Sequence, residues 1–190
     1  MDLAGTVVTA PNLEWTELPL QASLFERFGV LVRIGRGVGA GLLLGGGPLH
    51  GSRFAASEIG HVVVGTDGGE PCVCGKQGCL ETWIATTRLE AKLVDSSAAA
   101  GRNDVICGAA ALLGSALAPI VGALDLAEVV LSGQEQLLGG LIVDVTFETI
   151  RSRTMAQFHG HLTVRLTTLG HDIVLRGAAV MVISARLGVS

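Results

Sequence analysis

The feature that most constrains this chain is a run of three cysteines within eight residues, Cys72-Val73-Cys74-Gly75-Lys76-Gln77-Gly78-Cys79, with His61 eleven residues before it. Two thiols separated by a single residue rarely close a disulfide, whereas three thiolates and one imidazole complete the tetrahedral shell that Zn²⁺ prefers. Gly75 and Gly78 permit the positive φ angles that a tight loop around an ion requires. The sequence therefore predicts a closed, structural zinc site; the alternative is a set of buried free thiols and an unrelated histidine. The predicted ligands are His61, Cys72, Cys74 and Cys79.

Composition favours a packed interior and excludes two classes of partner. Among 190 residues, 49% are hydrophobic and 16% are charged, and the mean hydropathy is +0.56. These values are too apolar for a disordered chain and favour an α/β core. The net charge is −4 and no block of like charge occurs. We therefore expect no binding to nucleic acid or to anionic lipid by this chain alone.

Two segments bear on targeting and on membranes. Residues 1–5 lack a basic region followed by an apolar stretch, so no secretory signal is expected and a cytoplasmic location is the default. Residues 105–124 carry no charge, which meets the length rule for a transmembrane helix. This run is rich in alanine and glycine, contains Pro119, and has no cluster of Lys or Arg beside it. We predict a buried core helix that ends near Pro119 or Gly122.

The order of predicted elements indicates an α/β fold. Helices alternate with strands in the second half of the chain, a pattern typical of a layered sheet. A turn at Gly35-Arg36-Gly37 joins two strands into a hairpin. Strands are expected at residues 6–10, 30–34, 38–44, 128–132 and 162–166, helices at 18–28, 80–94, 105–121, 139–151 and 173–185, and loops at 11–15, 65–78 and 95–102.

Two carboxylates lie close to the cysteine run in the sequence. One is in Glu58-Ile59-Gly60-His61, and the other is Glu81, two residues after Cys79. Carboxylates and imidazoles beside a rigid metal loop can hold a polyhydroxylated ligand, because each carboxylate accepts two hydroxyl protons. The alternative for Glu81 is an acidic residue that stabilises the first turn of a helix.

Together these motifs resemble the ROK family of sugar-responsive repressors, uncharacterised reading frames and sugar kinases. Residues 58–61 and 72–81 are similar to the family signature E-x-G-H followed by C-x-C-G-x-x-G-C-x-E. Further segments resemble family elements in the same order along the chain. They are Pro11-Asn12-Leu13, a loop that helps to cover the sugar; Gly35-Arg36-Gly37-Val38-Gly39-Ala40-Gly41, a glycine-rich stretch; Glu128-Val129-Val130-Leu131-Ser132-Gly133, near the nucleotide region; and Arg176-Gly177-Ala178-Ala179, in the terminal helix.

The resemblance implies an α/β fold of the actin-like, ribonuclease-H-like (ASKHA) type with a zinc-binding knuckle, incomplete in this chain. In that fold, sugar and ATP occupy a cleft between two lobes. Residues 1–30 would be a remnant of the N-terminal lobe, 31–172 the C-terminal lobe, and 173–190 a terminal helix that packs back toward the first lobe. The implied sugar-binding residues are Glu58, His61, Glu81 and Asn12; the implied nucleotide-binding residues are Gly35, Gly37 and Gly133; the implied zinc ligands are His61, Cys72, Cys74 and Cys79.

The chain also departs from the family pattern. From the comparison with the family pattern, we expect this sequence to lack the strand that carries an Asp and a phosphate loop, and to lack the winged helix-turn-helix of the repressors. The family places a strand, an Asn-Asp pair with the catalytic base, and a helix where this chain passes directly from Val30 to Leu31. Its only Asn-Asp pair, Asn103-Asp104, follows the knuckle and is interpreted as a coincidence. Arg36 stands where the kinases tend to have Thr.

These departures favour the repressor branch. The expected function is the sugar-binding and oligomerisation region of a sugar-responsive transcriptional regulator, a fragment stabilised by structural Zn²⁺, with no DNA-binding domain and no catalytic residue. The expected partners are a sugar and further copies of the chain, and ATP with Mg²⁺ is not expected. One alternative is an ATP-dependent sugar kinase. The departures count against it, because phosphoryl transfer depends on the positioning that the missing segments would supply. Another is a decayed gene product that retains only a folded zinc lobe.

Overall fold

A computed structural model describes most of the central part of the chain. The described residues are 7–10, 15–18, 29–44, 47–53, 56–65, 69–96, 99–134, 136–155 and 160–169, with 173, 177 and 179. Several predictions therefore lie outside the described residues. These are the loop with Asn12, the helix expected at 18–28 apart from Leu18, and almost all of the terminal helix.

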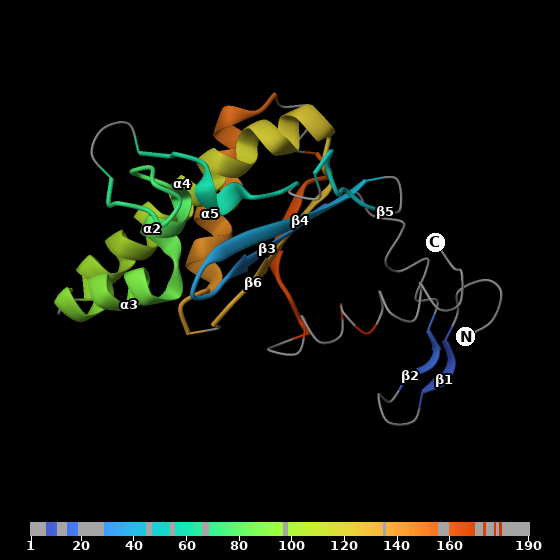
Figure 1. Cartoon of the computed structure of the whole chain (residues 1–190). Helices are drawn as coiled ribbons and strands as arrows, with labels where there is room; N and C mark the ends of the chain where they lie inside the picture. The colour runs from blue at the N-terminus through green and yellow to red at the C-terminus, as the bar shows by residue number, and fades with distance from the viewer. Residues whose placement is uncertain are drawn as a thin grey trace.

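A five-stranded mixed sheet forms the centre of the molecule, in the order β5-β4-β3-β6-β7 (Figure 1). The glycine turn at 35–37 folds β4 back antiparallel to β3, with Ile34 opposite Val38, as the hairpin prediction requires. On its other edge β3 runs parallel to β6, which in turn runs parallel to β7. The strands are β3 (Gly29–Ile34), β4 (Val38–Leu44), β5 (Gly47–Pro48), β6 (Glu128–Ser132) and β7 (Thr163–Leu166).

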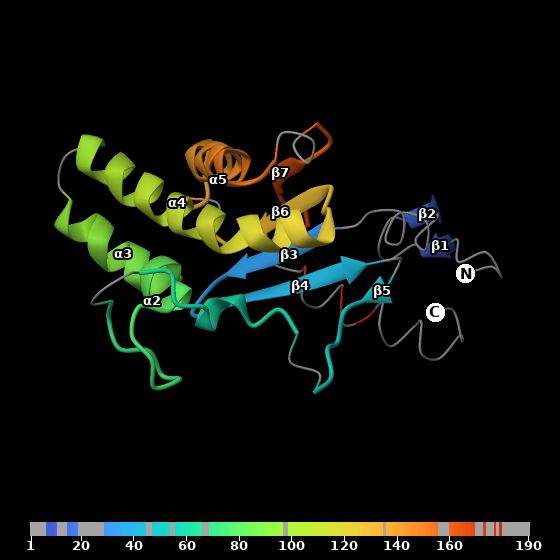
Figure 2. The same cartoon turned by 90° about the horizontal axis from the view of Figure 1, so that it is seen from above.

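Two long helices cover one face of this sheet (Figure 2). They are α4 (Ala99–Leu124) and α5 (Gly140–Arg153), and both belong to the same buried cluster as the sheet. β-branched residues at alternate positions of β3 point one face of the strand into this core, where Val32 is fully buried. Leu117 of α4 and Ile142 of α5 meet it from the helical layer.

The segment predicted as one helix at 80–94 is divided into two. Helix α2 (Leu80–Ile84) ends at Ala85, whose ψ of 144° is extended rather than helical. Helix α3 (Thr86–Asp95) then begins, and the Thr86 amide donates a hydrogen bond to the Gly35 carbonyl oxygen at 2.8 Å. This contact with the hairpin turn redirects the chain, a tertiary effect that helical periodicity does not contain.

Helix α4 is longer at both ends than the prediction of 105–121. It includes residues 99–102, which were predicted as loop, and it continues through Pro119. A proline inside a helix costs about 3 kcal/mol, but Ala118 and Val121 remain buried on the core side. The helix ends at Leu124, before Asp125, where φ reaches 50°. An end near Pro119 is therefore wrong, and an end near Gly122 is correct to within two residues.

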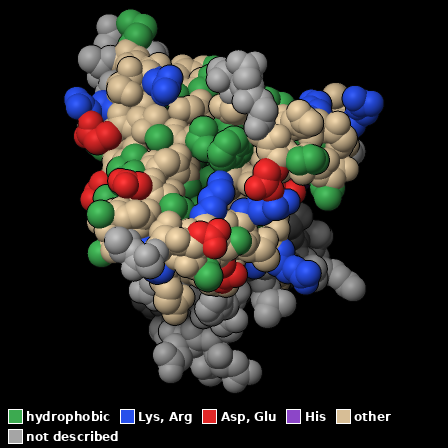
Figure 3. All heavy atoms as spheres, turned by 90° about the vertical axis from the view of Figure 1, so that its left-hand side faces the viewer, with side chains coloured by type: hydrophobic (Ala, Val, Ile, Leu, Met, Phe, Trp, Pro, Cys, Tyr) green, Lys and Arg blue, Asp and Glu red, His purple; other side chains and the backbone are tan. Residues whose placement is uncertain are grey.

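Helix α4 is long and apolar enough to span a membrane by length and composition, and 44% of its most apolar window is buried against the rest of the protein. This burial agrees with the predicted core helix. On the face shown in Figure 3, acidic, basic and apolar side chains are interspersed. That face therefore carries no extended basic patch.

A second, two-stranded sheet lies near the N-terminus. Strand β1 (Val7–Ala10) pairs antiparallel with β2 (Trp15–Leu18), with Ala10 opposite Trp15. The strand predicted at 6–10 is confirmed from Val7. Trp15 was assigned to a loop and Leu18 to a helix; both are in β2, because strand pairing recruits residues whose local pattern is ambiguous.

Two glycines of α4 provide a matched test of this packing. A Cβ at Gly114 would lie 2.6 Å from the Cβ of Thr149 in α5, whereas a Cβ at Gly108 would meet nothing within 4 Å. Gly114→Ala is expected to lower the free energy of unfolding by about 1–3 kcal/mol. Gly108→Ala is expected to raise it by up to ~1 kcal/mol through helix propensity. Denaturant titration measures both, and the same sign for the two variants would contradict this close α4–α5 contact.

Candidate metal centre and sugar site

The four predicted metal ligands form one cluster. A ring nitrogen of His61 and the sulfurs of Cys72, Cys74 and Cys79 all lie within 4.8 Å of one another. The Cys72 sulfur is 3.4 Å from Nδ1 of His61, and the Cys74 and Cys79 sulfurs are 3.6 Å apart. Bond lengths of ~2.3 Å to sulfur and ~2.0 Å to nitrogen place tetrahedral ligands about 3.8 and 3.5 Å apart. The donor set and its spacing therefore fit a zinc ion, and these four residues could hold a metal.

Glycines shape the loop that brings the sulfurs together. Gly75 and Gly78 have φ angles of 88° and 72°, as their role in the loop requires. The Cys72 amide donates to the Lys76 carbonyl oxygen at 2.8 Å, which closes the tight turn. A Cβ at Gly69 would lie 2.1 Å from the Gly78 Cα, so the two arms of the loop touch at their backbones.

The protein environment shifts the pKa values of two thiols in opposite directions. The backbone N–H of Lys76 lowers the pKa of Cys74 to about 7. Burial raises the pKa of Cys79 to about 12. Ligation by a metal requires thiolates, so binding here releases protons and its affinity increases with pH.

The glycine-rich turn, the 58–61 segment and the start of α2 meet at Val38. The Val38 amide donates to Oε2 of Glu81 at 3.1 Å. A Cβ at Gly60 would lie 2.1 Å from the Val38 carbonyl oxygen, and one at Gly37 would lie 2.7 Å from Oε2 of Glu81. Glycine at both positions lets these segments approach, and the Glu81 carboxylate is held by a backbone bond.

The predicted sugar-binding residues are distributed around this junction. Glu58 is exposed and directly precedes η2 (Ile59–His61), a short 3₁₀ helix. Glu81 is half-buried in the first turn of α2. Because Nδ1 of His61 faces Cys72, Nε2 is the nitrogen left for a second partner. The structure thus brings Glu58, His61 and Glu81 to the same end of β4.

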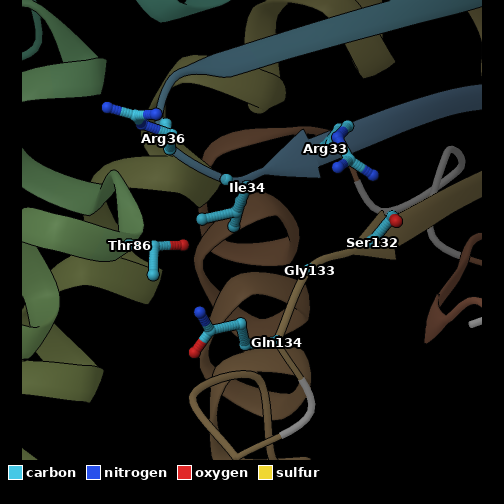
Figure 4. Close-up of a pocket in the computed structure, with 8 residues that line it drawn as sticks. Arg33, Ile34, Arg36, Thr86, Ser132, Gly133 and Gln134 are labelled. Atoms are coloured by element: carbon cyan, nitrogen blue, oxygen red, sulfur yellow. The ribbon is translucent and has the colours of Figure 1, made fainter. Parts of the chain in front are cut away.

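A cavity of about 240 Å³ lies at the ends of β3 and β6 (Figure 4). Gly35 and Gly133, two of the three glycines predicted to bind nucleotide, line it. The third, Gly37, lies against Glu81 instead. A Cβ at Gly133 would be 2.5 Å from the Ile34 carbonyl oxygen, so glycine lets the two strand ends meet.

Comparison with known proteins identifies the family of this chain. The model of the ROK family matches residues 29–185. The chain belongs to the ROK family. Its mixed sheet and its likeness to solved ROK structures show the actin-like fold of the ROK sugar kinases.

The relatives of this ROK chain include both kinases and repressors. The glucokinase of Halalkalibacterium halodurans is 29% identical over 182 residues, which cover 80% of this chain and 55% of the glucokinase. The DNA-binding transcriptional repressor Mlc of Escherichia coli is 28% identical over 193 residues, covering 88% of this chain and 47% of Mlc. The crystal structure of a ROK hexokinase from Thermus thermophilus has a TM-score of 0.66 and 28% identity, over 80% of this chain and 56% of the hexokinase. The chain spans about half the length of these relatives.

Several residues that line the cavity at the ends of β3 and β6 were not predicted from the sequence. Arg33, Thr86 and Gln134 line it beside the glycines. They come from three segments that become neighbours only through the parallel pairing of β3 with β6 and the contact between Thr86 and Gly35. Asn103 and Asp104 are exposed on α4 and line neither the cavity nor the metal cluster.

The uninterrupted strand β3 bears on the predicted lobes. It runs from Gly29 to Ile34 without an insertion, so no strand, Asn-Asp pair or helix separates Val30 from Leu31. The predicted boundary between residues 30 and 31 falls within this strand. The division into lobes stays a prediction.

Proposed function

We propose that this region is the zinc-stabilised, sugar-binding domain of a ROK transcriptional regulator. The observation that carries the proposal is the junction at Val38, where the amide holds the Glu81 carboxylate beside the 58–61 segment. The proposal includes association with further copies of the chain and a cytoplasmic location. Similarity to Mlc supports the regulatory role.

In this proposal the two glutamates, Glu58 and Glu81, have a different role in sugar binding from His61. Glu58 and Glu81 accept hydrogen bonds from sugar hydroxyls, and a bound carboxylate can accept two at once. His61 would use Nδ1 for the metal and Nε2 for the sugar, so the metal loop and the ligand share one side chain. Zinc, when bound, supplies a rigid link between the 58–61 segment and α2. A sugar that contacts both segments stabilises their present arrangement, which is how ligand binding would be transmitted.

A second candidate, an ATP-dependent sugar kinase, is favoured by similarity to the glucokinase and by the cavity at Gly35 and Gly133. Transfer of a phosphoryl group to a sugar hydroxyl needs a base, which contributes about 10²–10⁴ in rate. In the proposed site Glu58 and Glu81 accept sugar hydroxyl hydrogen bonds. Among the described residues, none of those that line the cavity is a carboxylate. The regulator therefore remains the preferred proposal.

Titration of the purified chain with hexoses and amino sugars tests sugar binding. We expect Glu81→Gln to weaken binding roughly tenfold, because the amide loses the charge that accepts hydroxyl protons. Its oxygen can still accept the Val38 N–H, so the fold is retained. Glu90→Gln, on the exposed side of α3, is the matched control and should bind like the parent. Calorimetry gives both affinities.

Two outcomes would contradict the proposal. Absence of heat with every sugar, in protein loaded with zinc, would remove the sugar-binding role. Sugar-dependent release of ADP from ATP in a coupled assay with glucose, mannose or N-acetylmannosamine would favour the kinase instead. We expect turnover at background, and loss of such turnover in Asp104→Ala would assign the base to the Asn103-Asp104 pair.

A further inference from the structure

The three cysteines of the metal loop differ in their exposure to solvent. The Cys74 side chain is exposed, whereas Cys72 and Cys79 are buried. Residues 73–77 are all exposed, so Cys74 lies within a continuous exposed turn. A solvent oxidant reacts with a thiol only where it can reach the sulfur. Of the three loop cysteines, Cys74 is therefore the one that an oxidant reaches first.

A second sulfur lies beside that of Cys74. The sulfurs of Cys74 and Cys79 are 3.6 Å apart, so a shift of about 1.6 Å brings them to disulfide bonding distance. Gly75 gives the turn room for this shift, because a Cβ there would meet nothing within 4 Å. The Cys72 sulfur instead faces Nδ1 of His61 at 3.4 Å, and two cysteines separated by one residue rarely pair. Cys79 is therefore the partner of Cys74 that the geometry favours.

Cys79 also connects the loop to the 58–61 segment. It directly precedes α2 and pairs with Val63 in an isolated β-bridge. Its thiol donates a weak hydrogen bond to the His61 carbonyl oxygen at 3.5 Å, and the Cys72 sulfur contacts the His61 ring. The loop thus holds His61 from two sides. A disulfide at Cys79 removes the thiol hydrogen, and with it one of these two contacts.

We propose that Cys74 and Cys79 form a redox switch, in which hydrogen peroxide converts the pair to a disulfide and the loop releases its metal ion. The Cys74 thiolate attacks one peroxide oxygen, the O–O bond breaks, and hydroxide leaves, so that Cys74 becomes a sulfenic acid. The Cys79 thiolate then attacks the Cys74 sulfur, the S–S bond forms, the S–O bond breaks, and a second hydroxide leaves. The two sulfurs lose two electrons, and the peroxide gains them.

The disulfide removes two of the four metal ligands. His61 and Cys72 alone do not complete the tetrahedral shell that zinc prefers, and η2 then loses its rigid link to the loop. The effect on sugar binding rests on the proposed function, whereas the disulfide does not. We expect sugar affinity to be at least roughly tenfold lower in the oxidised chain than in the reduced chain. A dithiol reverses the step by thiol–disulfide exchange.

Peroxide treatment of the zinc-loaded full chain, followed by tryptic digestion without reductant, tests the pair. Lys76 is the only basic residue between Cys74 and Cys79, so trypsin separates peptide 54–76 from peptide 77–88. We expect mass spectrometry to find these two peptides joined, with fragment ions that place the link at Cys74. A metal-sensitive dye should record the zinc released as the disulfide forms. Dithiothreitol should restore both the free thiols and the metal binding.

Two variants control this experiment. Cys107→Ser changes a half-buried thiol outside the metal cluster, and it should form the same link and release its zinc like the parent. In metal-free protein, peroxide should join the two peptides of the parent but not those of Cys74→Ser. This comparison identifies the reacting sulfur even though the serine variant does not hold the metal.

Several results would overturn the proposal. They are thiols that stay free in peroxide, a link at Cys72, a sulfinic acid in place of the disulfide, and a disulfide that forms without loss of metal or in a chain that never held it. Equal sugar affinity of the reduced and oxidised chains would remove the coupling to the sugar site. Sugar titration of the reduced chain alone tests the proposed function, so a failure there leaves the disulfide result standing.

Discussion

Cys74→Ser is expected to abolish zinc binding, while the parent chain carries one zinc per chain. The Cys74 side chain is exposed, so its replacement by serine removes a thiolate without disturbing the packed core. A ligand that binds only the folded state stabilises it by about 4 kcal/mol at roughly a thousand times its dissociation constant. We therefore expect the variant to lose several kcal/mol of stability in zinc-containing buffer. Elemental analysis and denaturant titration measure the two effects.

The control and the pH dependence sharpen this test. Cys107→Ser changes a half-buried thiol in α4 that is outside the metal cluster, and it should keep its zinc. Since the pKa of Cys74 is lowered to about 7, zinc affinity is expected to fall steeply as the pH drops below that value and protons compete for the thiolates. Equal metal content in the Cys74 variant and the parent, or none in either, would show that these residues do not form a zinc site.

Gly60→Ala is expected to disrupt the junction at Val38, where the proposed sugar-binding residues lie, by a clash with the backbone. The added Cβ would lie 2.1 Å from the Val38 carbonyl oxygen, a distance that only a shift of η2 or β4 can relieve. Overpacking of this kind costs about 1–3 kcal/mol and sometimes more. We expect a loss near the upper end, because the obstacle is backbone rather than a flexible side chain. The same shift moves Glu58 and His61 away from Glu81, so sugar affinity should fall as well.

Gly39→Ala, one residue beyond Val38, is the matched control. A Cβ there would meet nothing within 4 Å, and alanine in a strand is more stable than glycine by roughly 0.5–1 kcal/mol. Denaturant midpoints and sugar calorimetry of both variants give the comparison. If Gly60→Ala were as stable as Gly39→Ala and bound sugar equally well, the close approach of the 58–61 segment to β4 would not be required.

The metal cluster could be predicted from the sequence because its geometry is local. Three cysteines within eight residues, separated by Gly75 and Gly78, have few arrangements that avoid bringing their sulfurs together. The hairpin around 35–37 is also local, since a glycine turn between two apolar runs pairs them directly. The E-x-G-H segment was recognised for the same reason, although its contact with Val38 was not.

Features that depend on distant parts of the chain were decided only by the tertiary structure. The pairing of β3 with β6 joins segments on opposite sides of the knuckle, and no local pattern states which strand lies next to which. That pairing helps to form the cavity and places Arg33 opposite Ser132. The end of α4 depends on burial beyond Pro119, which outweighs the intrinsic preference of the proline.

The candidate binding groups of this ROK chain could thus be identified from the sequence alone. They are the thiols, the imidazole and the carboxylates, which lie close together along the chain. Tertiary structure decided which of them face one another. The Glu81 carboxylate depends on an amide 43 residues away, and the cavity combines a strand end, a helix start and a second strand end. Contacts at such separations arise from packing of the whole sheet against α4 and α5, and packing is a property that short-range patterns do not encode.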